Sequence, residues 1–171
     1  MIASESQSEA LVIRAATDAD MAGLCAVRNA PAAHGAKLRE AANGTVKFLV
    51  ATIRGEIVGF ATLFLTNPTT GSAKSHVPKL SDCFVAASCR SRGIGRALVG
   101  ARETLARLEG HRRLYVSVDP VENPRWLAFF QGRGYKALHD APYRKREPRD
   151  ADNGGVEEVL IWRQDLVMEI A

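Results

Sequence analysis

The chain has 171 residues, of which 46% are hydrophobic and 25% charged, with a formal net charge of +4. This length suits one domain that buries its own core, and the composition excludes disordered, fibrous and disulfide-scaffold proteins. No stretch is apolar enough to span a membrane, so we expect no membrane partner. Cys25, Cys83 and Cys89 lack the spacing of a disulfide framework or a metal site, which indicates a cytoplasmic protein with reduced thiols and no bound metal.

The arginines are spread over turns and helix faces and are not gathered in a patch interleaved with aromatic residues. A small polyanionic ligand therefore explains the basic balance as well as a nucleic acid would. The run Arg144-Lys145-Arg146 is a weak candidate for nucleic-acid contact. We do not expect a nucleic-acid partner.

The N-terminal third predicts a strand, two helices and a hairpin. Residues 1–9 are polar and are expected to be a disordered tail, so the domain spans 10–171. The expected strands are 11–15, 48–53 and 57–65, and the last two are joined by a turn short enough for an antiparallel hairpin. Thr17 with Asp20 resembles a capping box and opens a helix that Pro31 ends, and a second short helix covers 34–43.

A strand, a helix and a second strand follow in the middle of the chain. Residues 67–78 are expected to be a loop, in which His76, with Lys79 after it, belongs to a solvated segment or borders a substrate site. The strand 80–85 precedes a helix over 94–108. Its apolar side is expected to hold Ile94, Ala97, Leu98, Ala101, Leu105 and Leu108, with Arg96, Arg102, Glu103 and Arg107 mostly elsewhere. The strand 114–118 then returns as a right-handed parallel crossover.

The C-terminal part predicts one more helix and two strands. Asn123 is expected to cap a helix that has Pro124 at its first position, and the helix is apolar enough to be buried. A strand covers 135–138, a charged loop covers 139–155, and a strand at 159–162 closes the sheet.

The turn before the helix at 94–108 is the strongest candidate for a ligand site. Arg90, Gly93 and Gly95 stand in an Arg-x-x-Gly-x-Gly pattern. Glycines let the backbone approach a ligand closely, and the free N–H groups of a helix start, with its dipole, favour an anion. The chain contains no Walker loop, and Leu98 stands where a dinucleotide fingerprint needs its third glycine. The alternative is a solvated basic turn.

This turn resembles the Arg/Gln-x-x-Gly-x-Gly/Ala loop of the GNAT acyltransferase superfamily. A second motif of many relatives, an Asn followed by a Tyr and a Gly-aromatic pair, is matched by Asn123, Phe130, Gly134 and Tyr135. The resemblance runs from about Leu11 to Leu166. It implies an α/β (α+β) fold of one domain, with a mixed, mostly antiparallel sheet of six to seven strands flanked by helices and with splayed central strands.

The resemblance also implies acetyl-CoA as cofactor, no metal, and a set of residues that hold it. Backbone groups of Phe84, Val85 and Ala86 would pair with the pantetheine arm. The pyrophosphate would be held by the loop residues Cys89, Arg90, Ser91, Arg92, Gly93, Ile94, Gly95, Arg96 and Ala97. Asn123 is either a cofactor contact or only a helix cap, and Phe130 stands near the cofactor.

Phe130 departs from the family, because many relatives carry there a tyrosine that protonates the leaving thiolate. A thiolate is a tolerable leaving group at neutral pH, so loss of this acid slows the reaction without forbidding it. Ser117 or Tyr135 is an alternative donor. Asp82 is the candidate base or amine anchor, since a Glu-Asp pair of some relatives, including polyamine acetyltransferases, is reduced here to Ser81-Asp82; a structural aspartate is the alternative.

The resemblance therefore predicts an N-acetyltransferase that moves an acetyl group to a primary amine by direct attack in a ternary complex. An acyl-CoA-binding sensor with little or no turnover is the alternative, which Phe130 and Ser81 favour slightly. The acceptor is a small molecule or a peptide amine and is set by the loops at 30–45, 66–79 and 139–155. Relatives are often dimers, which leaves a homodimer open.

Overall fold

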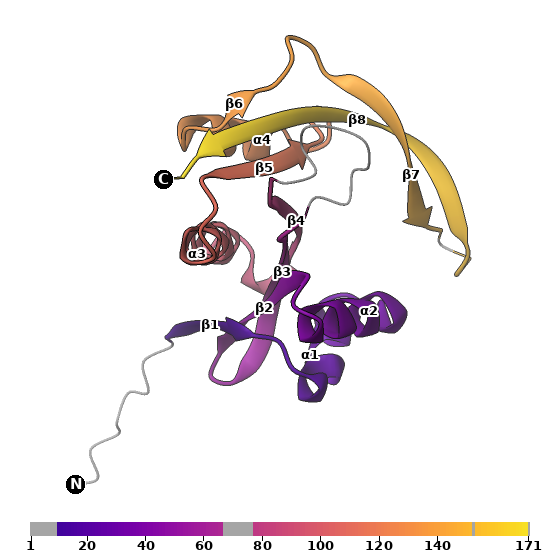
Figure 1. The fold of residues 1–171 in the computed structure, drawn as a ribbon. Helices are drawn as coiled ribbons and strands as arrows, with labels where there is room; N and C mark the ends of the chain where they lie inside the picture. Colours follow the sequence, from indigo (N-terminus) through magenta and orange to yellow (C-terminus); the bar gives the residue numbers. More distant parts are fainter. Residues whose placement is uncertain (1–9, 67–76, 152, 171) are drawn as a thin grey trace, which may run out of the picture.

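The structure is a computed structural model that describes residues 10–66, 77–151 and 153–170. The predicted tail 1–9 and His76 lie outside the described residues. The strands are β1 Leu11–Ala15, β2 Val46–Ile53, β3 Glu56–Phe64, β4 Lys79–Val85, β5 Arg113–Val118, β6 Lys136–Ala137, β7 Tyr143–Asp150 and β8 Val156–Glu169. They form one sheet in the order β1-β2-β3-β4-β5-β8-β6, and β7 pairs with β8 (Figure 1). Within the described ranges every pair is antiparallel except β4–β5, which confirms the predicted mixed α/β fold.

Helices cover both faces of this sheet. They are α1 Met21–Val27, α2 Pro31–Ala42, α3 Ile94–Leu108 and α4 Pro124–Gly132, with short 3₁₀ turns η1 Asp18–Asp20 and η2 Ala87–Cys89. In Figure 1, α1 and α2 lie on one side of β2 and β3, and α3 lies on the other. Along β2, Phe48 and Val50 pack with α1 and α2, whereas Leu49 and Ala51 pack with α3. Burial on both faces explains why this strand is apolar almost throughout.

The entry to α1 is tied to β1 by a buried carboxylate. The N–H of Thr17 donates to Asp20 at 2.8 Å, as the predicted capping box requires, and both terminal nitrogens of Arg14 donate to Asp20 at 2.8 Å. The prediction that Pro31 ends this helix was wrong. The helix ends at Val27, and Pro31 is the first residue of α2, where a missing N–H costs nothing.

The predicted apolar side of α3 is rotated from the observed one. Leu108 is 78% exposed, whereas Arg102 and Glu103 are each 2% exposed. The prediction that α4 is buried was also wrong for most of the helix: Phe130 is buried, but Trp126, Leu127 and Phe129 are only half-buried. An apolar side of α4 is therefore left to line a cavity.

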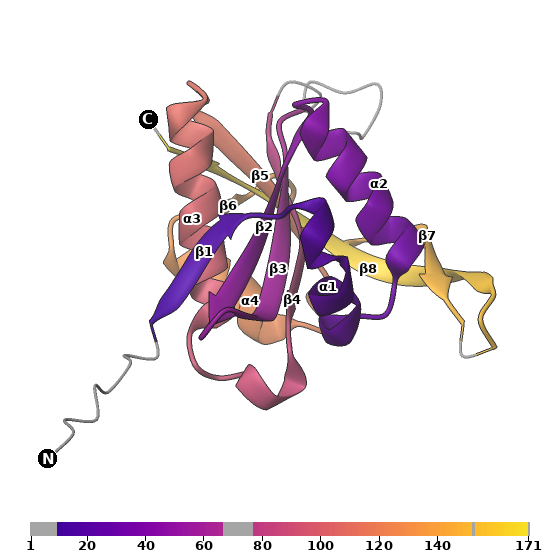
Figure 2. The same cartoon turned by 90° about the horizontal axis from the view of Figure 1, so that it is seen from below.

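The predicted loop at 139–155 contains a strand. β7 pairs with β8 over its full length, from Tyr143 opposite Arg163 to Asp150 opposite Val156. The two strands form a ribbon that projects beyond the rest of the sheet (Figure 2). Most side chains of β7 are exposed, so they need not be apolar, and cross-strand charges such as Glu147 with Arg163 stabilise the pairing. In the part of the chain that the structure describes, the sheet has eight strands, one more than the upper number predicted.

Candidate active site

The centre of the site is a gap between β4 and β5. The two strands pair only at Lys79 with Tyr115 and Leu80 with Val116, and then they separate. The predicted splayed central strands are therefore present. Two cavities of about 540 and 450 Å³ open on this gap, here named the loop cavity and the splay cavity. Both are lined by Cys83, Phe84, Asn123 and Trp126, so the two cavities adjoin across the gap.

The loop cavity is bounded by the glycine turn. Ser91 has φ 61° and Gly93, the residue that caps α3, has φ 81°. Left-handed residues beside ordinary ones turn successive N–H groups toward a common point, which makes a concave anion site. The amides of Ile94, Gly95 and Arg96 belong to the first turn of α3, where no intrahelical carbonyl reaches them. The turn is therefore built to receive an anion.

Most of the predicted cofactor residues line the loop cavity. They are Phe84, Val85, Cys89, Arg90, Ser91, Gly93, Ile94, Gly95, Arg96 and Asn123. Four of the predicted backbone donors are already engaged: the N–H of Ala86 donates to Val58, that of Cys89 to Ala86, that of Arg90 to Ala87, and that of Ala97 to Gly93. Ala86, Arg92, Ala97 and Phe130 do not line this cavity, and Phe130 lines the splay cavity.

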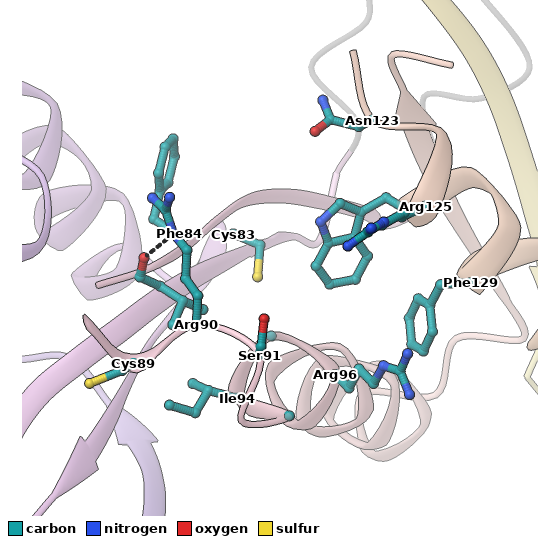
Figure 3. A pocket seen from close by; sticks show the side chains of 14 residues that line it. Cys83, Phe84, Cys89, Arg90, Ser91, Ile94, Arg96, Asn123, Arg125 and Phe129 are labelled. Carbon is teal, nitrogen blue, oxygen red and sulfur yellow. Dashed lines mark hydrogen bonds between the residues drawn. The ribbon is translucent and has the colours of Figure 1, made fainter. Parts of the chain in front are cut away.

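Arginine side chains surround the loop cavity. The Nε–H of Arg90 donates to the carbonyl oxygen of Val85 at 3.2 Å, so it holds the loop to the end of β4 (Figure 3). Arg96 lies over the ring of Phe129, at 5.3 Å from its centroid. Arg125 also lines the cavity and was missed by sequence reasoning, although it follows Pro124 at the start of α4, the end of a helix that faces a site.

Asn123 and Trp126 place the start of α4 against both cavities. The carbonyl of Asn123 accepts the N–H of Trp126 at 3.1 Å, so Asn123 occupies the N-cap position as predicted. Its side chain makes no capping bond, so capping does not explain why an asparagine stands here. Figure 3 shows Asn123 and Arg125 across the cavity from Arg90 and Ser91.

Asp82 is the extra residue of a bulge in β4. Ala61 pairs with Cys83 and Thr62 with Ser81, which leaves Asp82 unpaired and at φ 38°. Aspartate tolerates this left-handed conformation better than most residues. The bulge turns Asp82 into the splay cavity, where Ser117 from β5 also lies. The structure thus brings the two predicted catalytic residues to one cavity.

A buried arginine on α3 holds this bulge. Nη1 of Arg102 donates to the carbonyls of Thr62 at 2.9 Å and Ser81 at 2.8 Å, and Nε donates to that of Leu98 at 3.1 Å. Burial lowers the pKa of Arg102, but the group stays charged because its ordinary pKa is so high. Sequence reasoning missed Arg102, yet position 102 is one helical turn from Leu98, which is fully buried.

Tyr135 is not a proton donor for the site. Its hydroxyl donates to Glu103 at 3.0 Å, and the same carboxylate binds Arg133 at 2.6 Å. Burial and the charge of Glu103 raise the pKa of Tyr135. The ring packs against Phe130 in the core, so the tyrosine serves packing.

Several further features limit the chemistry of the site. Burial raises the pKa of the Cys83 thiol, which keeps it protonated and a poor nucleophile at the junction of the cavities. Glu147 of β7 and Arg163 of β8 form a two-bond ion pair, at 3.0 and 2.6 Å, on the wall of the splay cavity. Lys79 lines the same cavity, and burial lowers its pKa. No cluster of three or more potential metal ligands occurs in the described part of the chain.

The comparisons with known proteins agree with this geometry. A model of the acetyltransferase (GNAT) family matches residues 13–135, most of the chain and all of the residues around the glycine turn. The chain belongs to the GNAT family of acetyltransferases. A search of curated protein sequences finds no significant match.

Solved GNAT structures share the fold over almost the whole chain. An N-acetyltransferase from Staphylococcus aureus Mu50 is 18% identical, with a TM-score of 0.72, and the match covers 95% of this chain and 99% of that one. A ribosomal-protein-alanine N-acetyltransferase from Brucella melitensis is 21% identical, with a TM-score of 0.72 and coverage of 92% and 99%. The yncA protein of Salmonella typhimurium, solved with its cofactor acetyl-CoA, is 15% identical, with a TM-score of 0.67 and coverage of 95% of each chain.

Within the described ranges, none of the helices is both long and apolar enough to cross a bilayer.

Proposed function

We propose that the protein is an acetyl-CoA-dependent N-acetyltransferase that transfers the acetyl group to a primary amine by direct attack in a ternary complex. The observation that carries this proposal is the junction of the two cavities. The glycine turn, an anion site, and the bulge with Asp82, a carboxylate, lie on opposite sides of one gap in the sheet. A GNAT structure solved with acetyl-CoA, the yncA protein, shares this fold.

The residues of the loop cavity fit coenzyme A. The free amides of Ile94, Gly95 and Arg96 suit a pyrophosphate, and Arg90, Arg96 and Arg125 add positive charge. A Cβ on Gly95 would stand 3.1 Å from Trp126, so only glycine leaves the space between loop and helix open. When bound, acetyl-CoA supplies a thioester as the electrophile.

The chain's own residues would then act from the splay cavity. Asp82 would anchor a cationic amine or accept its proton, because an ammonium cannot attack until it is deprotonated. Ser117 would donate a proton to the leaving thiolate, directly or through water, since Phe130 has no donor. Oxyanion stabilisation would come from backbone N–H groups of β4 near the bulge.

Phe130 favours a second function, an acyl-CoA sensor with little turnover. The side chain is 5% exposed and packs between Trp126 and Tyr135, so it acts as a core residue. Both functions need the loop cavity. Only the enzyme needs Asp82 and Ser117.

The test is release of the free CoA thiol from acetyl-CoA across a panel of amines, beside calorimetric binding of acetyl-CoA. Binding with turnover on any amine supports the enzyme. Binding without turnover on polyamine, amino-acid and peptide amines supports the sensor. Absence of binding would reject both functions.

We further propose a cytoplasmic protein with a small or peptide amine as acceptor and no nucleic-acid partner. The three cysteines are free thiols, which supports a reducing compartment. Arg144 lies over Trp162 and Arg146 lies 3.9 Å from Glu158, so the basic run is partly neutralised. Light scattering would distinguish a homodimer from a monomer.

A further inference from the structure

A buried carboxylate lies beside the splay cavity and has no part in the proposed mechanism. Asp165 of β8 is 1% exposed. The hydroxyl of Tyr143 donates to its carboxylate, with both oxygens at 3.0 Å. A buried charge is costly unless it is hydrogen-bonded, so this group calls for a role.

The inner end of the cluster reaches the cavity. Ser117, which lines the splay cavity, is the cross-strand partner of Asp165, so both side chains lie on one face of the sheet. The register therefore places the hydroxyl of Ser117 beside the Asp165 carboxylate, to which the Tyr143 hydroxyl also donates. This pairing joins the cavity wall to the buried carboxylate.

The outer end of the cluster reaches solvent at His139. Its Nδ1 lies 2.6 Å from the carbonyl oxygen of Ala141, and because a carbonyl only accepts, Nδ1 carries the proton. The unprotonated Nε2 lies 3.5 Å from Oδ2 of Asp165 and accepts the N–H of Asp165 at 3.3 Å. The His139 side chain is 30% exposed, so a proton taken up at Nε2 can pass to water.

The surrounding charges suit this arrangement. Burial raises the pKa of Tyr115 and of Tyr143, with Asp165 adding to the effect, so both hydroxyls keep their protons. Lys79 of β4 faces Tyr115 at 5.8 Å from the ring centroid, and burial lowers its pKa. Glu147 and Arg163 neutralise each other.

We propose that Ser117, Asp165 and His139, with the Tyr143 hydroxyl bound to Asp165, form a proton relay from the splay cavity to solvent. The relay rests on the proposed function. In that reaction a bond forms between the amine nitrogen and the acetyl carbon, and the carbon–sulfur bond breaks with its electron pair on sulfur. An ammonium acceptor loses two protons. One of them replaces the proton that Ser117 gives to sulfur. The other passes from Ser117 through the relay and leaves the protein.

The test compares the kcat/KM of His139→Gln with that of wild type, with and without added imidazole. We expect kcat/KM to fall about 10-fold, because water replaces a relay group poorly, and imidazole to restore it in this variant alone. The matched control is His111→Gln, outside both cavities and the cluster, which should leave kcat/KM unchanged.

A second variant guards against a folding defect. Tyr143→Phe removes one hydroxyl and keeps the ring, and it should lower kcat/KM without changing the Kd of acetyl-CoA. An unchanged kcat/KM in both variants would overturn the relay. So would a loss in His139→Gln that imidazole does not restore, since a purely structural role would give that result. Wild-type protein without turnover on any amine would instead reject the proposed function itself, and the relay with it.

Discussion

The guanidinium of Arg102 donates to the carbonyl oxygen of Ser81 at 2.8 Å, directly before the bulged residue Asp82. A second bond, to Thr62, joins the opposite strand to the same Nη1. The bulge therefore depends on a side chain of α3, the helix that also begins at the glycine turn. One helix thus positions the anion site and the candidate catalytic carboxylate.

Replacing Arg102 should destabilise the fold strongly. Arg102→Met leaves the carbonyls of Thr62 and Ser81 without this donor in a buried place, and we expect a loss of about 3 kcal/mol in the free energy of unfolding. Arg107→Met on the same helix is the control. Arg107 is exposed and binds one carbonyl among the described residues, that of Ile170, so its loss should cost less than about 1 kcal/mol. Urea denaturation measures the free energy of unfolding of both variants. Equal losses would contradict the role of Arg102 in holding the bulge.

Alanine substitution of either glycine of the turn should weaken acetyl-CoA binding, for a different reason in each case. Gly93→Ala places a Cβ at φ 81°, which costs about 1–2 kcal/mol of backbone strain and should weaken acetyl-CoA binding about 10-fold as the loop relaxes. Gly95→Ala pushes against Trp126 at 3.1 Å and should weaken binding similarly with little loss of stability. Gly100→Ala, inside α3, should stabilise by about 0.5–1 kcal/mol with unchanged binding. Calorimetry and thermal melts distinguish the three variants. Wild-type affinity for acetyl-CoA in Gly95→Ala would contradict the role of this glycine in the cofactor site.

Asp82→Asn should lower kcat/KM about 10²-fold on a working amine, since general-base catalysis has at least this effect. Binding of acetyl-CoA should stay unchanged, because the carboxylate faces the splay cavity. Glu56→Gln, at the exposed start of β3, is the control. Wild-type kcat/KM in Asp82→Asn would leave Asp82 with a structural role only.

Tyr135→Phe should separate packing from catalysis. The change removes the bond to Glu103, and we expect a loss of about 1 kcal/mol in stability. The value of kcat should not change, because the hydroxyl lies outside both cavities. A large fall in kcat at constant stability would show that the hydroxyl acts on the reaction.

The pair of Arg14 and Asp20 gives a prediction for acid pH. Hydrogen bonds from Arg14 lower the pKa of Asp20 to about 2. A carboxylate whose pKa is lowered on folding stabilises the native state above its unfolded pKa, and this stabilisation is lost as the pH falls toward 2. Asp20→Asn should therefore be less stable than wild type at pH 7, and the difference should shrink between about pH 4 and pH 2. A difference in stability that does not depend on pH would show that the introduced asparagine is a poorer hydrogen-bonding or packing group, and that the charge of Asp20 is not the cause.

The positions of most strands along the chain and the glycine turn could be predicted from the sequence because both depend on local patterns. Apolar runs in β2, β3 and β5 and the spacing of Arg90, Gly93 and Gly95 are visible in the letters. Arg102 and Glu103 were predicted on the wrong side of the helix. A charged side chain can be buried when it has a partner, and their partners, Ser81 and Arg133, are distant in sequence. β7 was missed because a strand that is paired on one side and mostly exposed carries no apolar alternation to detect.

Positions within the site divide in the same way. The loop residues could be predicted, but whether a backbone N–H is free depends on turns such as η2, which engages the amide of Cys89. The proton relay joins β5, β7, β8 and the segment around His139, so no spacing in the sequence reveals it.

The two halves of β8 have different neighbours, so we expect them to differ in dynamics. Its C-terminal half lies between β5 and β6, whereas its N-terminal half has only β7 beside it. An isolated two-stranded ribbon is marginally stable, so amide hydrogen exchange should slow sharply along the strand from Val156 toward Leu166. Asp165 lies in the part of β8 where exchange should be slow. Tyr143 lies opposite Arg163, near the point where the exchange rate should change. Transient opening of the ribbon would therefore determine what fraction of the time the Tyr143 hydroxyl is hydrogen-bonded to the Asp165 carboxylate.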